Sequence, residues 1–257
     1  MALVSRRIAA QALAILLCVP VQSTADEIRV ATASNFRDAM SALASKFEQE
    51  SGHSVVPIFG STGKHFAQII NGAPFDAFFA ADARRPEQLD QDGAAIPGSR
   101  FTYAMGKLVL WSPEANYVDA NGVVLERGAF HYLAIANPEL APYGTAARDV
   151  LESLGLWESL SQRLVLGENI GQAFLYVQSG NADLGFIAWS QLVGNNTTPI
   201  QGSVWQVPEN LYRPIEQQAV LLNDREAARA FMSFIRSPEA ARIIRKHGYT
   251  LPAKNES

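Results

Sequence analysis

IRVATASNF, residues 28–36, begins with the composition of a strand and ends where a helix is expected to start. Its first residues include Ile28, Val30 and Thr32, which favour extended structure. Small polar residues follow, and the apolar residues after them recur at the spacing of one helix face: Phe36, Met40, Leu43 and Phe47. The stretch therefore predicts a strand, a polar turn and a helix, the first half of a βαβ unit.

The same alternation continues along the chain. Strands are predicted at 53–59, 76–80, 132–136, 164–166 and 184–188, with helices at 62–72, 144–154 and 170–179. A longer strand is expected over 101–111 and another extended segment over 217–222. Two helices are expected to end the chain, the first capped by Asn223 and the second running from Ser237-Pro238 to Gly248.

Two α/β halves therefore flank the extended segments near 101–111 and 215–222. This order predicts two lobes, each a mostly parallel sheet flanked by helices, joined by two crossing hinge strands. The first lobe is expected to contain residues 26–107 and 218–257, and the second residues 108–217.

The first 25 residues have the pattern of a secretory signal peptide. Arg6 and Arg7 precede a mostly apolar run at 8–21, which is too short to span a bilayer. Ser23 and Ala25 then form a small-residue cleavage site, so we expect the mature chain to begin at Asp26. The pair of arginines leaves general or twin-arginine export open. Residue 18, the one cysteine, lies in this segment behind a leucine, which disfavours a lipoprotein.

Composition excludes several classes of protein. The chain has 257 residues, 48% of them hydrophobic, which is enough for a substantial core. Without the signal peptide it carries 19 basic and 25 acidic residues and no cysteine, so disulfides and thiol chemistry are excluded. No cluster of Lys and Arg offers a footprint for nucleic acid.

Motifs of hydrolases and metal sites are absent from the sequence. It has no G-x-S-x-G elbow and no H-E-x-x-H motif. Its four histidines are scattered, and each is expected at the surface or at a strand end: His53, His65, His131 and His247. We therefore expect no catalytic residues, no cofactor and no protein ligands to a metal.

Two polar turns follow predicted strands just where helices begin: ASN at 33–35 and GSTGK at 60–64. Free backbone N–H groups, the positive end of the helix dipole and hydroxyl or amide side chains meet at such turns, forming a neutral cradle for an anion. The second turn is no nucleotide loop, because Ile58 and His65 occupy positions where that motif needs glycine and Ser/Thr. Ordinary helix capping is the alternative for each turn.

The sequence resembles the periplasmic molybdate-binding proteins of ABC importers, which have the type II periplasmic binding-protein fold. In the first half the resemblance rests on VATASNF (30–36), FGSTGK (59–64), AQI (67–69), NGAPFD (71–76) and AAD (80–82). In the second half it rests on ANPE (136–139), APYG (141–144), GENI (167–170) and LGF (184–186). These stretches extend over nearly all of the mature chain.

The resemblance implies a site for a tetrahedral dianion between the lobes, held by neutral donors. The implied ligand-binding residues are Ser34, Asn35, Ser61, Thr62, Tyr143 and Ile170, the last two through backbone N–H groups. Some members of the family also use a tyrosine hydroxyl where this chain has Ala188. Tyr143 is a candidate to replace it, and a packing role beside the hinge is the alternative.

The resemblance also implies a monomeric periplasmic receptor, not an enzyme, that binds molybdate and tungstate and delivers them to an ABC permease in the inner membrane. A receptor for another tetrahedral oxyanion such as sulfate is one alternative. An exported α/β hydrolase is another, disfavoured by the missing catalytic motifs.

Overall fold

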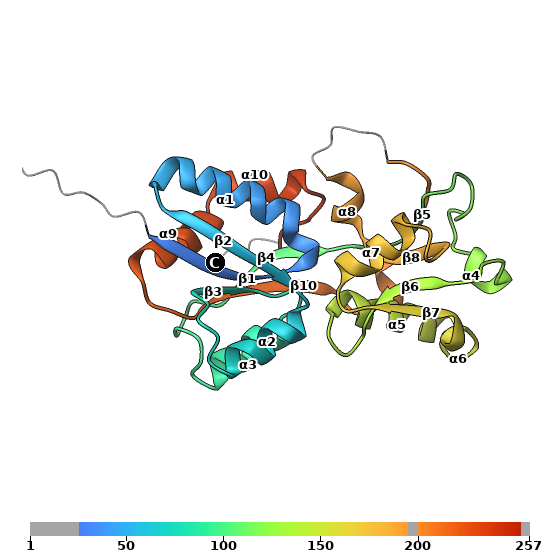
Figure 1. Ribbon diagram of the computed structural model, residues 1–257, viewed down its shortest axis with the longest axis horizontal. Helices are drawn as coiled ribbons and strands as arrows, with labels where there is room; N and C mark the ends of the chain where they lie inside the picture. Colours follow the sequence, from blue (N-terminus) through green and yellow to red (C-terminus); the bar gives the residue numbers. More distant parts are fainter. Residues whose placement is uncertain (1–25, 195–199, 253–257) are drawn as a thin grey trace, which may run out of the picture.

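The computed structural model describes residues 26–194 and 200–252, so the expected signal peptide lies outside the described residues. Figure 1 shows two lobes side by side, the first built from both ends of the described chain and the second from its middle. Each lobe contains one five-stranded sheet. Within the described ranges, no helix has the length and apolar character needed to cross a membrane.

The first lobe is organised on the sheet β2-β1-β3-β10-β4. The central strand β1 runs parallel to β2 and β3, whereas β10 runs antiparallel to β3 and β4. Helices α1 and α10 lie over one face and α2 and α3 over the other (Figure 1). The strands are β1 (Glu27–Ala33), β2 (Ser54–Gly60), β3 (Ala77–Phe79), β4 (Phe101–Gly106) and β10 (Ile215–Leu221). The helices are η1 (Ser34–Phe36), α1 (Arg37–Ser51), α2 (Thr62–Ile70), α3 (Arg84–Gln91), α9 (Glu226–Ile235) and α10 (Pro238–Lys246).

The second lobe repeats this plan with the sheet β7-β6-β8-β5-β9. Strand β6 is parallel to β7 and β8, and β5 is antiparallel to β8 and β9. The strands are β5 (Leu108–Ser112), β6 (Leu133–Ala136), β7 (Leu164–Gly167), β8 (Leu184–Ala188) and β9 (Ser203–Gln206). The helices are α4 (Val124–Arg127), α5 (Pro142–Ser153), α6 (Trp157–Leu160), η2 (Ser161–Arg163), α7 (Ile170–Gln178), α8 (Trp189–Val193) and η3 (Glu209–Leu211). The two-lobed α/β fold is confirmed, with parallel pairing confined to three neighbouring strands of each sheet.

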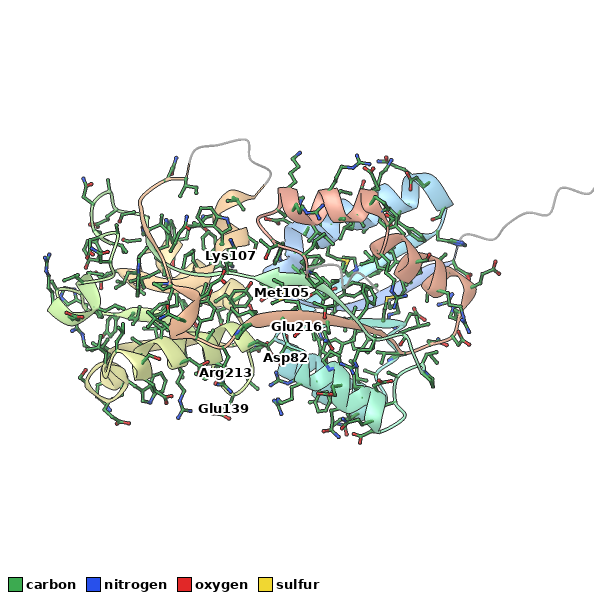
Figure 2. The ribbon with its side chains drawn as sticks, turned by 180° about the vertical axis from the view of Figure 1, so that it is seen from behind. Asp82, Met105, Lys107, Glu139, Arg213 and Glu216 are labelled. Carbon is green, nitrogen blue, oxygen red and sulfur yellow. The ribbon has the colours of Figure 1, made fainter. Side chains whose placement is uncertain are left out.

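The chain crosses between the lobes twice. The single strand predicted over 101–111 is in fact two strands, β4 and β5, which belong to different sheets and change over at Lys107. The chain returns between β9 and β10, and Figure 2 shows Met105, Lys107, Arg213 and Glu216 where the lobes meet. Strand β10 pairs in the first sheet from Ile215 onward. The predicted lobe boundaries themselves stay a prediction.

Helix ends follow local capping chemistry. Ser237 caps α10 as predicted, because its Oγ accepts a hydrogen bond from the Ala240 N–H at 3.2 Å. The predicted cap at Asn223 is wrong, since α9 begins at Glu226. The Asn223 amide instead donates to Asp76 Oδ1 at 3.1 Å, so it joins the end of β10 to the residue before β3.

Each lobe has its own hydrophobic core. The first lobe buries an aromatic cluster in which Phe36 contacts Tyr103 edge-on, with ring centroids 4.7 Å apart. The second buries the apolar residues of its central strands, among them Leu110, Leu133 and Phe186. The second core also includes Ala33 and Ala81 of the first lobe, so small apolar residues lie beside the polar groups where the lobes meet.

Candidate functional site

All six predicted site residues line one small cavity between the lobes, here called the central cavity. The first lobe contributes Ser34, Asn35, Ser61 and Thr62, and the second contributes Tyr143 and Ile170. The cavity has a volume of about 10 Å³, far below the roughly 300–1,000 Å³ of pockets for drug-sized ligands, so only a small ligand fits between the lobes.

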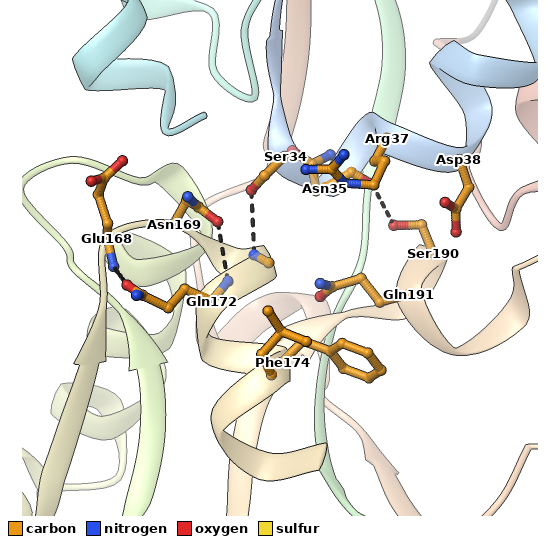
Figure 3. A pocket seen from close by; sticks show the side chains of 12 residues that line it. Ser34, Asn35, Arg37, Asp38, Glu168, Asn169, Gln172, Phe174, Ser190 and Gln191 are labelled. Atoms are coloured by element: carbon orange, nitrogen blue, oxygen red, sulfur yellow. Dashed lines mark hydrogen bonds between the residues drawn. The ribbon is translucent and has the colours of Figure 1, made fainter. Parts of the chain in front are cut away.

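The turn after β1 brings Ser34 and Asn35 to the cavity. Both are buried, with 8% and 5% of their surface exposed. Ser34 Oγ accepts a hydrogen bond at 3.3 Å from the N–H of Gly171, in the first turn of α7 in the other lobe (Figure 3). Because a hydroxyl that accepts keeps its own proton, Ser34 can still donate.

The turn after β2 brings Ser61 and Thr62 to the opposite wall. Ser61 is the N-cap of α2, and its Oγ accepts from the Lys64 N–H at 3.4 Å. Thr62 is 1% exposed, and its Oγ1 accepts from the Ala81 N–H at 3.0 Å. The Ser61 side chain therefore caps helix α2, the role that the sequence left open as the alternative to anion binding. The Thr62 hydroxyl keeps a proton to donate.

Two helices of the second lobe begin at the cavity. Ile170 is the first residue of α7, and Tyr143 lies in the first turn of α5. The first N–H groups of a helix have no acceptor within it, and they carry the positive end of the helix dipole. Both positions therefore offer a backbone donor to a ligand between the lobes.

The side chain of Tyr143 extends from the cavity to a crossing strand. A Cβ placed on Gly106, the last residue of β4, would lie 2.2 Å from the Tyr143 hydroxyl. Burial raises the pKa of Tyr143 well above its usual value, so the hydroxyl stays protonated. Among the described residues it has no hydrogen-bond partner. The structure thus shows the packing position beside the hinge that was the alternative for Tyr143.

The described lining of the central cavity has no charged side chain. Neighbouring cations have other partners, and Arg37 lies over the ring of Phe59. Lys64 contacts Glu168 across the lobes at 3.2 Å, and Arg85 forms an ion pair with Asp82. In the described part of the chain no cluster of acidic and His residues could hold a metal ion. The donors around the cavity are hydroxyls and backbone N–H groups, which stabilise an anion without a fixed countercharge.

His65 lies beneath the second turn and is 2% exposed, so the expectation of a surface position is wrong for it and for His247, which is 3% exposed. A Cβ on Gly60 would lie 2.9 Å from His65 Nε2, and His65 Nδ1 lies 3.1 Å from Gln68 Oε1. Burial lowers the pKa of His65, which keeps the ring neutral at pH 7. The turn therefore has no cation under it.

A larger cleft, here called the outer cleft, opens beside the central cavity (Figure 3). It has a volume of about 470 Å³ and is lined by charges of both signs, including Arg37, Asp38 and Glu168. Because two of these three side chains are acidic, the outer cleft is less suited to an anion than the uncharged central cavity.

The lobes are closed on each other around the cavity. The Gly63 N–H donates to the Leu140 carbonyl of the other lobe at 2.8 Å, and Ser190 Oγ donates to the Asn35 carbonyl at 3.1 Å. Two α/β lobes that enclose a small polar cavity define a ligand-binding protein of the two-lobed class.

The chain belongs to the family of bacterial extracellular solute-binding proteins, whose family model matches residues 28–250. It is 47% identical to the molybdate-binding protein ModA of Azotobacter vinelandii, over 96% of this chain and 98% of that protein. It is 44% identical to the ModA of Rhodobacter capsulatus, over 95% of this chain and 96% of that protein. The resemblance to molybdate-binding proteins is thereby confirmed, as is the expectation of a binding protein rather than an enzyme.

Solved structures agree with this family. The periplasmic molybdate-binding protein of Azotobacter vinelandii superposes with a TM-score of 0.85 at 46% identity, over 88% of this chain and 99% of that one. The sulfate-binding protein SubI of Mycobacterium tuberculosis has a TM-score of 0.71 at 13% identity, over 89% of this chain and 88% of that one. The second similarity shows the fold alone.

Proposed function

We propose that this protein is a periplasmic receptor that captures molybdate, or tungstate, in the central cavity. The observation that carries the proposal is the uncharged cavity lined by hydroxyls and helix-start N–H groups from both lobes. The names of the two ModA relatives support molybdate as the ligand. The proposed ligand-binding groups are those of Ser34, Asn35, Ser61, Thr62, Tyr143 and Ile170, with Tyr143 acting through its backbone N–H.

Neutral donors explain how such a site selects its ligand. Backbone N–H groups are fixed in place and cannot accept a hydrogen bond from a protonated oxygen, so a shell rich in them disfavours anions that carry a proton. Each hydrogen bond to a charged oxygen contributes about 1.5–3 kcal/mol. Five to seven of them give a gross gain of about 8–21 kcal/mol before the costs of ordering and lobe closure. Submicromolar affinity, about −8 kcal/mol or better, is within that range.

Delivery completes the proposed function. The receptor closes on the anion by hinge motion between the lobes and carries it as a monomer to an ABC permease in the inner membrane. The periplasmic location is supported by the expected signal peptide and by the description of the Azotobacter structure as periplasmic.

Calorimetric titration of the expected mature protein, residues 26–257, with molybdate, tungstate, sulfate and phosphate tests the proposal. We expect molybdate and tungstate to bind one to one with submicromolar dissociation constants, and sulfate and phosphate to bind at least a hundredfold more weakly. Absence of heat with both molybdate and tungstate would sink the proposal. Tighter binding of sulfate would instead make the protein a sulfate receptor.

A further inference from the structure

Asn35 is held from two sides by residues far away in the sequence. Its Nδ2 donates to Gln217 Oε1 at 2.7 Å and lies 3.1 Å from the Tyr249 hydroxyl. The Tyr249 hydroxyl in turn donates to the Asn35 carbonyl at 2.7 Å. All three residues are buried, and Gln217 has no exposed surface. The amide and the carbonyl of Asn35 are thus both fixed before any ligand is considered.

An irregularity in the pairing of the strands β4 and β10 lies beside Gln217. Gln217 pairs with Ala104 and Gln218 pairs with Thr102, which leaves Tyr103 as an extra residue on β4. Such a bulge redirects side chains and is common beside binding sites. The Tyr103 hydroxyl lies 3.2 Å from Gln217 Oε1 and 3.0 Å from the Ala80 carbonyl, so its single proton is shared between the two.

Gln217 Oε1 therefore faces two donors, one from Tyr103 and one from Asn35. The opposite end of the Gln217 amide, Nε2, has no partner among the described residues and lies 3.0 Å from where a Cβ on Gly106 would stand. Exchanging the two ends of the amide would point a donor at the Asn35 Nδ2 and lose this contact. With Asn35 Nδ2 turned toward Gln217, Oε1 is the end that keeps this contact.

We infer that Gln217 is a positioning residue for anion binding, which it supports by holding Asn35 in place at the central cavity. The inference rests on the proposed function, because it concerns the same site. It adds to that function a residue that does not line the cavity and that belongs to the strand leading back from the second lobe. The Gln217 side chain thereby links anion binding to the position of β10, the strand by which the chain returns from the second lobe.

A set of variants tests whether Gln217 positions Asn35 or only stabilises the strands that cross between the lobes. Gln217→Leu removes the acceptor, Asn35→Ala removes the side chain it holds, and the third variant combines both. The control is Gln218→Leu, on the next residue of β10, whose amide bonds Arg100 and Thr102 instead of Asn35. Molybdate affinity is measured by calorimetry, and thermal unfolding of each free variant shows that it is folded.

We expect Gln217→Leu to weaken molybdate binding at least tenfold and Gln218→Leu less than threefold. In the Asn35→Ala background, Gln217→Leu should have no further effect, because a residue that acts through another contributes nothing once that other is gone. Equal effects of Gln217→Leu and Gln218→Leu, or full additivity with Asn35→Ala, would overturn the inference while leaving the proposed function intact. Absence of binding by the unmodified protein would overturn both.

Gln217→Glu provides a second variant should Gln217→Leu not fold. A protonated carboxyl keeps a carbonyl oxygen for Asn35, whereas the ionised form places a negative charge beside the anion. We therefore expect affinity within threefold of the unmodified protein near pH 5.5 and a loss of more than tenfold as the pH rises to 8.5. A pH profile parallel to that of the unmodified protein would contradict the inference.

Discussion

The hydroxyl groups of Ser34 and Thr62 show the logic of the site at the scale of single residues. Each accepts a backbone N–H, at 3.3 and 3.0 Å, from a neighbour that is distant in the chain. Each hydroxyl is thereby oriented and its proton left for a ligand. Each small side chain thus accepts a backbone N–H beside the cavity and keeps a proton for the proposed ligand.

Replacing both hydroxyls tests this directly. Ser34→Ala combined with Thr62→Ala removes two hydrogen bonds to a charged ligand, each contributing about 1.5–3 kcal/mol. We expect molybdate affinity by calorimetry to fall by more than tenfold. Ser41→Ala, which removes an exposed hydroxyl bonded only to the Arg37 carbonyl, is the control and should leave the affinity unchanged. Unchanged affinity of the double variant would place the site elsewhere.

The two polar turns pointed to Ser34, Asn35, Ser61 and Thr62 because strand-to-helix turns are local patterns, whereas Tyr143 and Ile170 were implied by the family resemblance. Sequence reasoning did not find Gln217 or Tyr249, which contact Asn35 across 182 and 214 residues of sequence. No local pattern encodes a contact over that distance. The sequence also did not predict the position of the Tyr143 hydroxyl, because that position depends on the close approach of Gly106 in strand β4.

Helix α2 contributes both to the fold and to the lining of the central cavity. Its N-cap, Ser61, lines the central cavity, and its first turn includes the buried His65. The sequence predicted the helix and its capping turn. Burial of His65 was missed because it depends on the fit of the ring against Gly60. The sequence predicted one strand over 101–111 because the hydrophobic alternation continues unbroken from β4 into β5, although these strands belong to different sheets.

A charged residue at position 61 tests whether Ser61 contributes to anion binding as well as capping helix α2. Aspartate and asparagine both cap helices well, so Ser61→Asp and Ser61→Asn should each keep the melting temperature within a few degrees of the unmodified protein. Only the aspartate places a negative charge at the cavity wall. We expect Ser61→Asp to bind molybdate at least tenfold more weakly than Ser61→Asn. Equal affinities of the two variants would show that this wall does not face the anion.

Buried His65 should make stability depend on pH. Burial lowers the pKa of His65 in the folded protein, so the unfolded chain binds more protons as the pH falls below about 6.5. The stabilisation is therefore complete above that pH and decreases toward acid, by at most about 1.4 kcal/mol per pH unit for one group. Urea unfolding between pH 5 and 8 measures this.

The matched variants for that experiment are His65→Gln and His131→Gln. His131 has 90% of its side chain exposed, so replacing it should leave the pH dependence as it was. His65→Gln should flatten the curve on the acid side. The same acid slope in His65→Gln and in the unmodified protein would contradict a neutral buried His65.

At the scale of the whole molecule, closure of the lobes makes the cavity. Residues 26–257 carry six more acidic than basic side chains, so long-range attraction does not favour an anion. Local dipoles and hydroxyls must hold it, and they come from both lobes. Binding and closure are therefore expected to be coupled.

Gly63 provides a test of this coupling. A Cβ on Gly63 would lie 2.9 Å from the Leu140 carbonyl of the other lobe. Gly63→Ala should therefore hold the lobes apart, weaken molybdate binding at least tenfold and reduce the ligand-induced decrease in radius of gyration measured by X-ray scattering. Lys64→Ala is the control, because its exposed ion pair with Glu168 contributes about 0.2–1 kcal/mol, less than about fivefold in affinity. Normal closure in Gly63→Ala would refute the coupling.

The central claim is that the anion lies in the uncharged cavity between the lobes. A crystal structure of the protein with tungstate tests it most directly, because the anomalous scattering of tungsten locates the ion independently of the protein. We predict one strong peak in the central cavity, with oxygens about 2.7–3.2 Å from Ser34 Oγ, Thr62 Oγ1 and the backbone nitrogens of Tyr143 and Ile170. A peak in the outer cleft beside Arg37, or no ordered tungsten, would contradict the account.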